Sequence, residues 1–143
     1  MLEHTHNTFN FELVSPEAKL ISEDAWQVVV PGEEGDIGVL PGHSPWVVSV
    51  RAGVVEFYKE EGAAPQKIFV AGGFADISAT NCTVLAEEAV NVNDLDQAEL
   101  ETQISNLIED LGLVEGEADL KKVQTALAMA KAKLSAVTGH LVL

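Results

Sequence analysis

Asp36 and His43 are the residues whose types and spacing suggest chemistry most directly. A carboxylate and an imidazole held close together can act as an acid–base pair, which would suit a hydrolase. No third group that would orient the imidazole is visible, and a rigid loop on a scaffold is where binding residues usually lie. Docking of a partner therefore explains the two residues better than catalysis. Hydrolysis at the Asp36/His43 edge stays an alternative.

The other reactive residues lack the neighbours that a catalytic or metal site requires. His4 and His6 resemble the His-x-His half of a metal-binding site, but no Glu follows at the spacing that a complete site would use. Gly72-Gly73 is followed by neither Lys-Ser/Thr nor a helix, which favours a hairpin turn over a phosphate loop. Cys82, the single cysteine, lies in a predicted strand without a base partner. We expect no catalytic residue, no metal and no cofactor.

The charge of the chain excludes several classes of partner. Among its 143 residues, 8 are basic and 23 acidic, which gives a net charge of −15. Nucleic acids and anionic lipid surfaces need concentrated Lys and Arg, so neither is an expected partner. No apolar run approaches the roughly 20 residues of a membrane-spanning helix, which argues against direct lipid insertion. The N-terminal residues show neither a secretion nor an import signal, and this favours a bacterial cytoplasmic face or synthesis inside an organelle.

A tight turn positions Asp36 and His43. Leu40, Pro41, Gly42 and His43 place proline second and glycine third, the pattern of a type II turn. The residue after His43 precedes a proline and is pushed toward extended backbone, so the chain leaves the turn as a strand. Asp36 and His43 are thus predicted on a stiff lobe at the surface.

Two regions divide the chain. Residues 1–91 carry many short runs of Val, Ile, Phe and Thr separated by Gly and Pro, which predicts an antiparallel β-sandwich of about ten short strands. Residues 92–143 change to the helical period and predict an antiparallel α-helical hairpin. Asp94 is expected to cap its first helix, Gly112 to end it, and Glu117 to begin the second.

Five segments, taken in order, resemble the epsilon subunit of the F-type ATP synthase, bacterial type. The central one, residues 35–45, is similar to the family segment G-[ED]-[IL]-G-x-x-P-G-H-[SA]-P. Gly72-Gly73 resembles the family's central glycine-pair hairpin. The other three segments are residues 9–17, 84–89 and 95–99.

The resemblance implies a non-catalytic rotor subunit of the central stalk, which couples c-ring rotation to ATP synthesis through the γ subunit in a proton-translocating enzyme. Asp36, Leu40, Pro41, Gly42 and His43 would contact the c-ring, and Ser15 would face γ. Apolar residues left on outer sheet faces should mark the γ contact. The resemblance also implies a peripheral place on the cytoplasmic face of the inner or plasma membrane.

The helical hairpin would regulate or inhibit ATP hydrolysis, with the β subunit as a transient partner. Residues 94–111 hold six acids and no base. Lys121, Lys122, Lys131 and Lys133 lie in the second helix, and would pair either with these acids or with an acidic surface of β. Ordinary matching of charges to the helix dipoles explains the same pattern.

Some family members bind ATP through an [IL]-D-x-x-R-A segment. Asp96 matches the Asp of that segment, but Glu99 stands at the Arg position. A triphosphate needs donors and positive charge, so an acid there argues against ATP binding. A free-standing small-ligand or nucleotide sensor with a helical lid remains a further alternative, and co-purification with γ would separate it from a rotor subunit.

Overall fold

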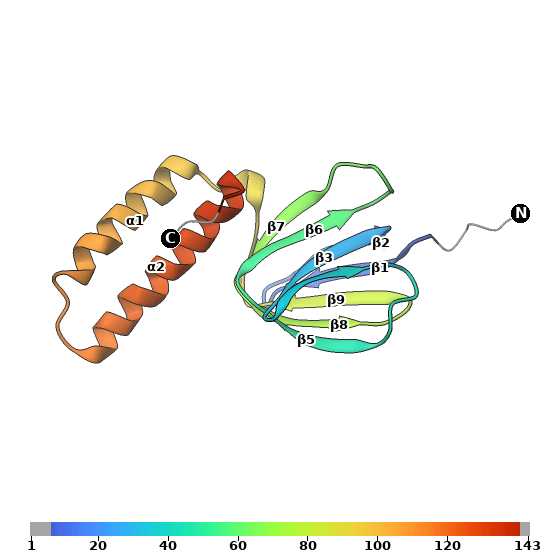
Figure 1. The fold of residues 1–143 in the computed structure, drawn as a ribbon, viewed down its shortest axis with the longest axis horizontal. Coiled ribbons are helices and arrows are strands. Elements are labelled where there is room, and N and C mark those ends of the chain that lie inside the picture. The colour runs from blue at the N-terminus through green and yellow to red at the C-terminus, as the bar shows by residue number, and fades with distance from the viewer. Residues whose placement is uncertain (1–6, 141–143) are drawn as a thin grey trace, which may run out of the picture. The chain divides into compact units, whose positions relative to one another are not determined.

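The computed structural model describes residues 7–140, which form ten strands and a pair of helices (Figure 1). Two compact units divide the chain, one ending at Val90 and the other beginning at Asn91. The strands are β1 (Phe9–Val14), β2 (Lys19–Ala25), β3 (Gln27–Gly32), β4 (Gly35–Val39), β5 (Trp46–Val50), β6 (Gly53–Tyr58), β7 (Gln66–Val70), β8 (Gly73–Ile77), β9 (Asn81–Ala86) and β10 (Ala89–Asn91). The short 3₁₀ helix η2 (Val92–Asp94) then leads to α1 (Gln97–Leu111) and α2 (Glu117–Thr138).

The strands form one hydrogen-bonded path folded into two layers. The first layer has the order β2-β1-β9-β8-β5, and the second has β10-β7-β6-β3 with β4 on the far side of β3. A single pair, Gly32 with Val50, joins β3 to β5 and so joins the layers. The predicted β-sandwich is confirmed. One detail is wrong: β1 and β9 pair in parallel, with Phe11 opposite Cys82, because they are distant in sequence and no hairpin constrains their direction.

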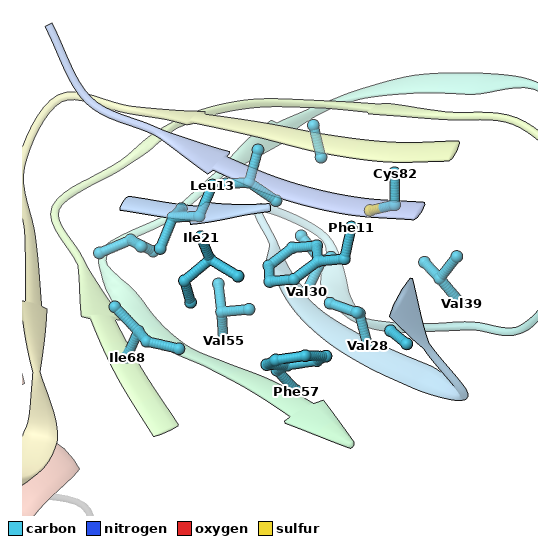
Figure 2. Packing of buried hydrophobic residues seen from close by; sticks show 14 of the residues in the cluster. Phe11, Leu13, Ile21, Val28, Val30, Val39, Val55, Phe57, Ile68 and Cys82 are labelled. Carbon is cyan, nitrogen blue, oxygen red and sulfur yellow. The ribbon is translucent and has the colours of Figure 1, made fainter. Parts of the chain in front are cut away.

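The space between the layers is filled by apolar side chains (Figure 2). Phe11 and Phe57 have ring centroids 5.2 Å apart and are almost fully buried. Cys82 is also fully buried, and its burial raises the pKa of the thiol to about 12. The thiol therefore stays protonated and unreactive near neutral pH. Packing of this kind makes the sandwich a stiff support for its surface loops.

The turn after β4 has the predicted geometry. Gly42 takes φ of +86°, which the third position of a type II turn requires. The His43 N–H donates to Leu40 O at 3.2 Å and closes the turn, and the Gly42 N–H donates to Ala79 O at 2.9 Å. The second bond ties the turn to the loop between β8 and β9, so the turn is held to the sandwich as well as closed on itself.

Gly72-Gly73 does not form a hairpin turn, and that prediction is wrong. β7 pairs with β6, whereas β8 pairs with β5 and β9, so the glycines carry the chain from one layer to the other. Gly73 has φ of +141°, and a Cβ added there would lie 1.9 Å from Leu85 O. Only glycine permits this close approach of two backbones. A glycine pair fits a crossing between layers as well as a hairpin turn. The residue type alone therefore did not distinguish the two structures.

The helical hairpin has a thin apolar seam. Leu100 of α1 and Leu127, Ala130 and Leu134 of α2 are buried. The predicted start at Glu117 and the end at Gly112 are confirmed. The predicted cap is wrong, because the side chain of Asp96, not of Asp94, accepts the Glu99 N–H, at 3.2 Å. Asp94 instead ends the 3₁₀ helix that precedes α1.

Two negative findings apply to residues 7–140. No helix there is both long and apolar enough to cross a membrane. No group of three or more His, Cys, Asp or Glu side chains in this part of the chain is placed to hold a metal ion. His4 and His6, the half-site considered from the sequence, lie outside the described residues.

Candidate functional site: an apolar row on the sandwich

Arg51, the only arginine of the chain, braces the turn between β3 and β4. Its Nη1 donates to Gly32 O, and its Nη2 lies 2.6 Å from Asp36 Oδ1. The Arg51 backbone N–H also donates to Pro31 O, at 2.9 Å. A planar guanidinium suits this two-sided contact better than an ammonium group would. Asp36 is thus held by an ion pair that ties β4 to the β5–β6 corner, a role that the sequence did not reveal.

The structure does not bring Asp36 and His43 together. Asp36 pairs with Pro31 near the start of β4, whereas His43 lies beyond the end of that strand. A strand rises about 3.3 Å per residue, so Leu40 is already roughly 13 Å along the strand from Asp36. His43 Nδ1 contacts Ser44 O at 2.7 Å, and Asp36 contacts Arg51. An acid–base pair cannot form across this distance, which removes the geometric basis for a hydrolase.

An exposed apolar row crosses the outer face of the first layer. Cross-strand pairing places Ser49 beside Phe74, Phe74 beside Leu85, and Leu85 beside Val14. Phe74 is 56% exposed and Leu85 51%, although strands normally turn such side chains inward. We call the apolar Val14, Phe74 and Leu85, together with the polar Ser49 at the end of the series, the outer row. A row of this kind on a rigid sheet is typical of a protein-docking surface.

Ser15 lies at one end of the outer row. A groove of about 680 Å³ begins there and includes all of the row, together with Arg51 and Glu33 from the braced corner. The Ser15 N–H and hydroxyl contact Ala18 O, at 2.9 and 3.4 Å, and close the turn between β1 and β2. Ser15 is therefore part of the same surface as Phe74 and Leu85. Its predicted contact with γ stays a prediction.

The structure shows what surrounds two of the predicted regulatory residues, Asp96 and Glu99, on α1. Asp96 caps α1, as described above, so its carboxylate is already used by the helix. Glu99 is exposed and borders a groove of about 520 Å³ along α1, whose other charged lining residue is Asp110. No lysine or arginine lines that groove. The lining supplies no positive charge for a triphosphate.

The lysines of α2 were expected to pair with the acids of α1 in a folded hairpin. Lys121 and Lys122 are exposed, and Lys131 and Lys133 are half-buried. Within the described residues, no ion pair joins Lys121, Lys122 or Lys131 to an acid of α1, although the two helices pack together. Charge pairing is therefore not what holds these three lysines in the hairpin.

The sequence missed Arg51, Phe74 and Leu85. The sequence held a signal for Leu85. Residues 84–86 are apolar on both faces of their strand, whereas a strand with one exposed face is expected to alternate apolar and polar residues. Arg51 gave no local signal, since its partners Gly32 and Asp36 are distant in sequence. A stiff sandwich with an apolar outer row and an attached helical hairpin defines a docking protein of a larger assembly rather than an enzyme.

Comparison with known proteins agrees with that class. The family "ATP synthase, Delta/Epsilon chain, beta-sandwich domain" matches residues 8–92. The ATP synthase epsilon chain of Rhodospirillum centenum is 46% identical over 134 residues, covering 91% of this chain and 92% of the relative. That of Rhodospirillum rubrum is 41% identical over 132 residues, covering 92% and 98%.

Solved structures show the same fold. A chain of the Euglena gracilis mitochondrial ATP synthase, solved with OSCP, F1 and c-ring, matches with a TM-score of 0.80 at 21% identity, covering 92% of this chain and 82% of that one. A chain of the Tetrahymena thermophila central stalk and c-ring matches with a TM-score of 0.60 at 9% identity, covering 90% and 96%. The chain belongs to the epsilon-chain family of ATP synthase, and it is a non-catalytic accessory subunit of that complex.

Proposed function

We propose that the chain is a rotor subunit of the central stalk, which couples c-ring rotation to ATP synthesis through the γ subunit. The outer row carries the proposal, because a half-exposed apolar row on a stiff sheet needs a partner and offers a fixed surface to one. We assign γ to this face, with Ser15 at its end. The chain would lie peripherally, on the cytoplasmic face of the inner or plasma membrane.

We place the c-ring contact at the turn between β3 and β4. Arg51 holds Asp36 and Gly32 there, and rigidity is what torque transmission requires of a contact. The predicted c-ring residues Leu40, Pro41, Gly42 and His43 form a turn at the other end of β4, roughly 13 Å along the strand from Asp36, and one interface of ordinary size includes both turns. Our proposal therefore extends the c-ring contact from Asp36 to these four residues.

The helical hairpin is the proposed regulatory element. A switch needs two arrangements of similar free energy and a partner that prefers one of them. The thin seam of α1 and α2 keeps their packing energy low, and the exposed Lys121 and Lys122 remain accessible to an acidic surface of the β subunit. In this proposal γ, β or the proton-motive force selects the state, and ATP bound to the hairpin does not.

Site-directed cross-linking in the assembled synthase tests these assignments. Ser15→Cys, Asp36→Cys and His43→Cys are each labelled with a photoreactive maleimide, while buried Cys82 stays unmodified. We expect cross-links from residue 15 to γ and from residues 36 and 43 to subunit c. Failure of the chain to co-purify with γ, or cross-links from residue 15 to subunit c alone, would overturn the proposal.

A further inference from the structure

β5 has one side of its backbone unpaired over most of its length. On one side it pairs with β8 at all five positions, from Trp46 opposite Ile77 to Val50 opposite Gly73. On its other side it pairs with β3 only at Gly32 and Val50. The Arg51 N–H and Ser49 O point to that second side, because they bond Pro31 O and the Glu33 N–H. Backbone groups alternate along a strand, so the N–H and C=O of Val47 point the same way.

The open side of β5 faces a groove of about 650 Å³. β4 lines its opposite wall and, among the described strands, pairs only with β3. Ile37 and Val48 are half-buried against the core and form part of its lining. Trp46, Glu33 and Glu34 also line it, and all three are exposed. The groove thus combines an unpaired strand edge, an apolar lining and acidic side chains.

This edge lacks the usual protection against strand pairing. Exposed edge strands commonly carry Lys, proline or a bulge, which prevents association with other chains. Residues 46–50 read Trp-Val-Val-Ser-Val, without a charge or a proline. Trp46 is 51% exposed and Val47 65%. An apolar edge of this kind invites aggregation unless another segment covers it in the working assembly.

Two observations identify the covering segment. Val47 pairs with Asp76 on the same outer face that carries the outer row, so the groove is continuous with the surface assigned to γ. Glu33 and Glu34 enter no ion pair within the described residues, and they complement a basic segment. A second copy of this chain would bring the same acids and another net charge of −15 against them.

We propose that an extended segment of the γ subunit, carrying Lys or Arg beside apolar residues, adds to β5 as a further strand. The identity of the partner rests on the proposed function, whereas the strand addition rests on the geometry of β5. Main-chain hydrogen bonds to Val47 and Ser49 would supply affinity, and side chains contacting Trp46 and the two glutamates would supply specificity.

Amide hydrogen exchange distinguishes strand addition from contact by side chains alone. The isolated chain and the assembled synthase are exchanged in parallel and digested, and the amides of Val47 and Ser49 are read at single-residue resolution. We expect both amides to exchange rapidly in the isolated chain and at least about tenfold more slowly in the synthase. Unchanged rates in a synthase that retains the chain would refute strand addition and leave the proposed function intact. Protection that appears in the isolated chain at high concentration would instead point to self-pairing.

A variant pair gives an independent test. Val47→Pro removes an N–H on the open side and no bond to β8, whereas Val47→Ala shortens the same exposed side chain and keeps the N–H. We expect the proline variant to bind the complex of γ and the c-ring roughly five- to tenfold more weakly than the alanine variant, the effect of about one hydrogen bond. Thermal unfolding of both isolated variants checks that each is folded. Equal binding of two folded variants would contradict the proposal, as would a loss that is larger for alanine.

Discussion

The sandwich and the helical hairpin use apolar residues in opposite ways. The sandwich encloses a continuous core that includes Phe11 and Phe57, both almost fully buried. The hairpin buries little besides the seam of Leu100, Leu127, Ala130 and Leu134, and leaves Leu113 79% exposed near the loop between its helices. Buried apolar area is the main source of stability. The sandwich therefore has the stability of a fixed scaffold, and the hairpin has that of an element able to rearrange.

Charge follows the same division. Arg51 and Asp36 form an ion pair across the sandwich corner, whereas Lys121, Lys122 and Lys131 of the hairpin form none with α1 within the described residues. Exposed ion pairs contribute at most about 1 kcal/mol each to stability. The Arg51 contact therefore adds little to the free energy of unfolding, and its main effect is to hold the turn between β3 and β4 in position. It fixes a turn, whereas Lys121, Lys122 and Lys131 form no such brace within the described residues.

The largest effect is expected in the sandwich core. Phe11→Ala should lower the free energy of unfolding by about 3–5 kcal/mol, because it removes a buried ring and leaves a cavity. The matched variant Phe74→Ala deletes the same side chain from the outer row, where it is 56% exposed, and should cost far less. Urea unfolding of the isolated chain measures both. Similar losses from the two variants would mean that the outer row is part of the stabilising core.

A smaller and local effect is expected in the hairpin. Leu127→Ala should destabilise the helices by about 2–3 kcal/mol, since Leu127 is buried in the seam. Both tryptophans, Trp26 and Trp46, lie in the sandwich, so their fluorescence reports that unit while far-ultraviolet circular dichroism reports helix content. We expect the unfolding transition followed by circular dichroism to shift to milder conditions and the transition followed by fluorescence to stay unchanged.

The control for that variant is Leu113→Ala, at an exposed position of the connecting loop. It should leave both transitions unchanged. If Leu127→Ala shifted the two transitions together, the hairpin and sandwich would unfold as one unit, and the contrast between a fixed and a movable region would be lost.

The smallest effect concerns the start of α1. Asp96→Ala should cost about 1 kcal/mol of hairpin stability, because it removes the acceptor for the Glu99 N–H. Asp94→Ala, only two residues earlier, should have nearly no effect, since Asp94 is exposed in the preceding 3₁₀ helix. Helix content on heating distinguishes them. A larger loss from Asp94→Ala would show that the helix begins earlier than the structure has it.

The sequence predicted what depends on neighbours along the chain. Pro41-Gly42 predicted the type II turn. The change in the spacing of apolar residues, from that of strands to that of helices, predicted a β-sandwich followed by a helical hairpin. It did not predict what depends on distant contacts. The parallel pairing of β1 with β9, the layer crossing at Gly73 and the brace by Arg51 each join segments far apart in sequence, so no local pattern encodes them.

The candidate site shows the same limit. The resemblance singled out Ser15 and the segment containing Asp36. Each of these residues lines a groove on the sandwich. Strand register was needed to show that Phe74 and Leu85 form a row with Val14, the neighbour of Ser15, and that Asp36 and His43 lie at opposite ends of β4. Asp94 was preferred over Asp96 as the helix cap because both precede helical residues, and only the backbone geometry separates them.

Retention of the chain in the purified synthase tests the docking role of the outer row most directly. Leu85→Asp places a charge in the row, and the control Asn81→Asp adds the same charge at the other end of the same exposed strand face. Both variants are co-expressed with the remaining subunits, and the amount of chain per γ subunit is measured after purification. We predict that Leu85→Asp is largely lost from the complex while Asn81→Asp is retained. Equal retention of the two, with Leu85→Asp folded, would contradict the account.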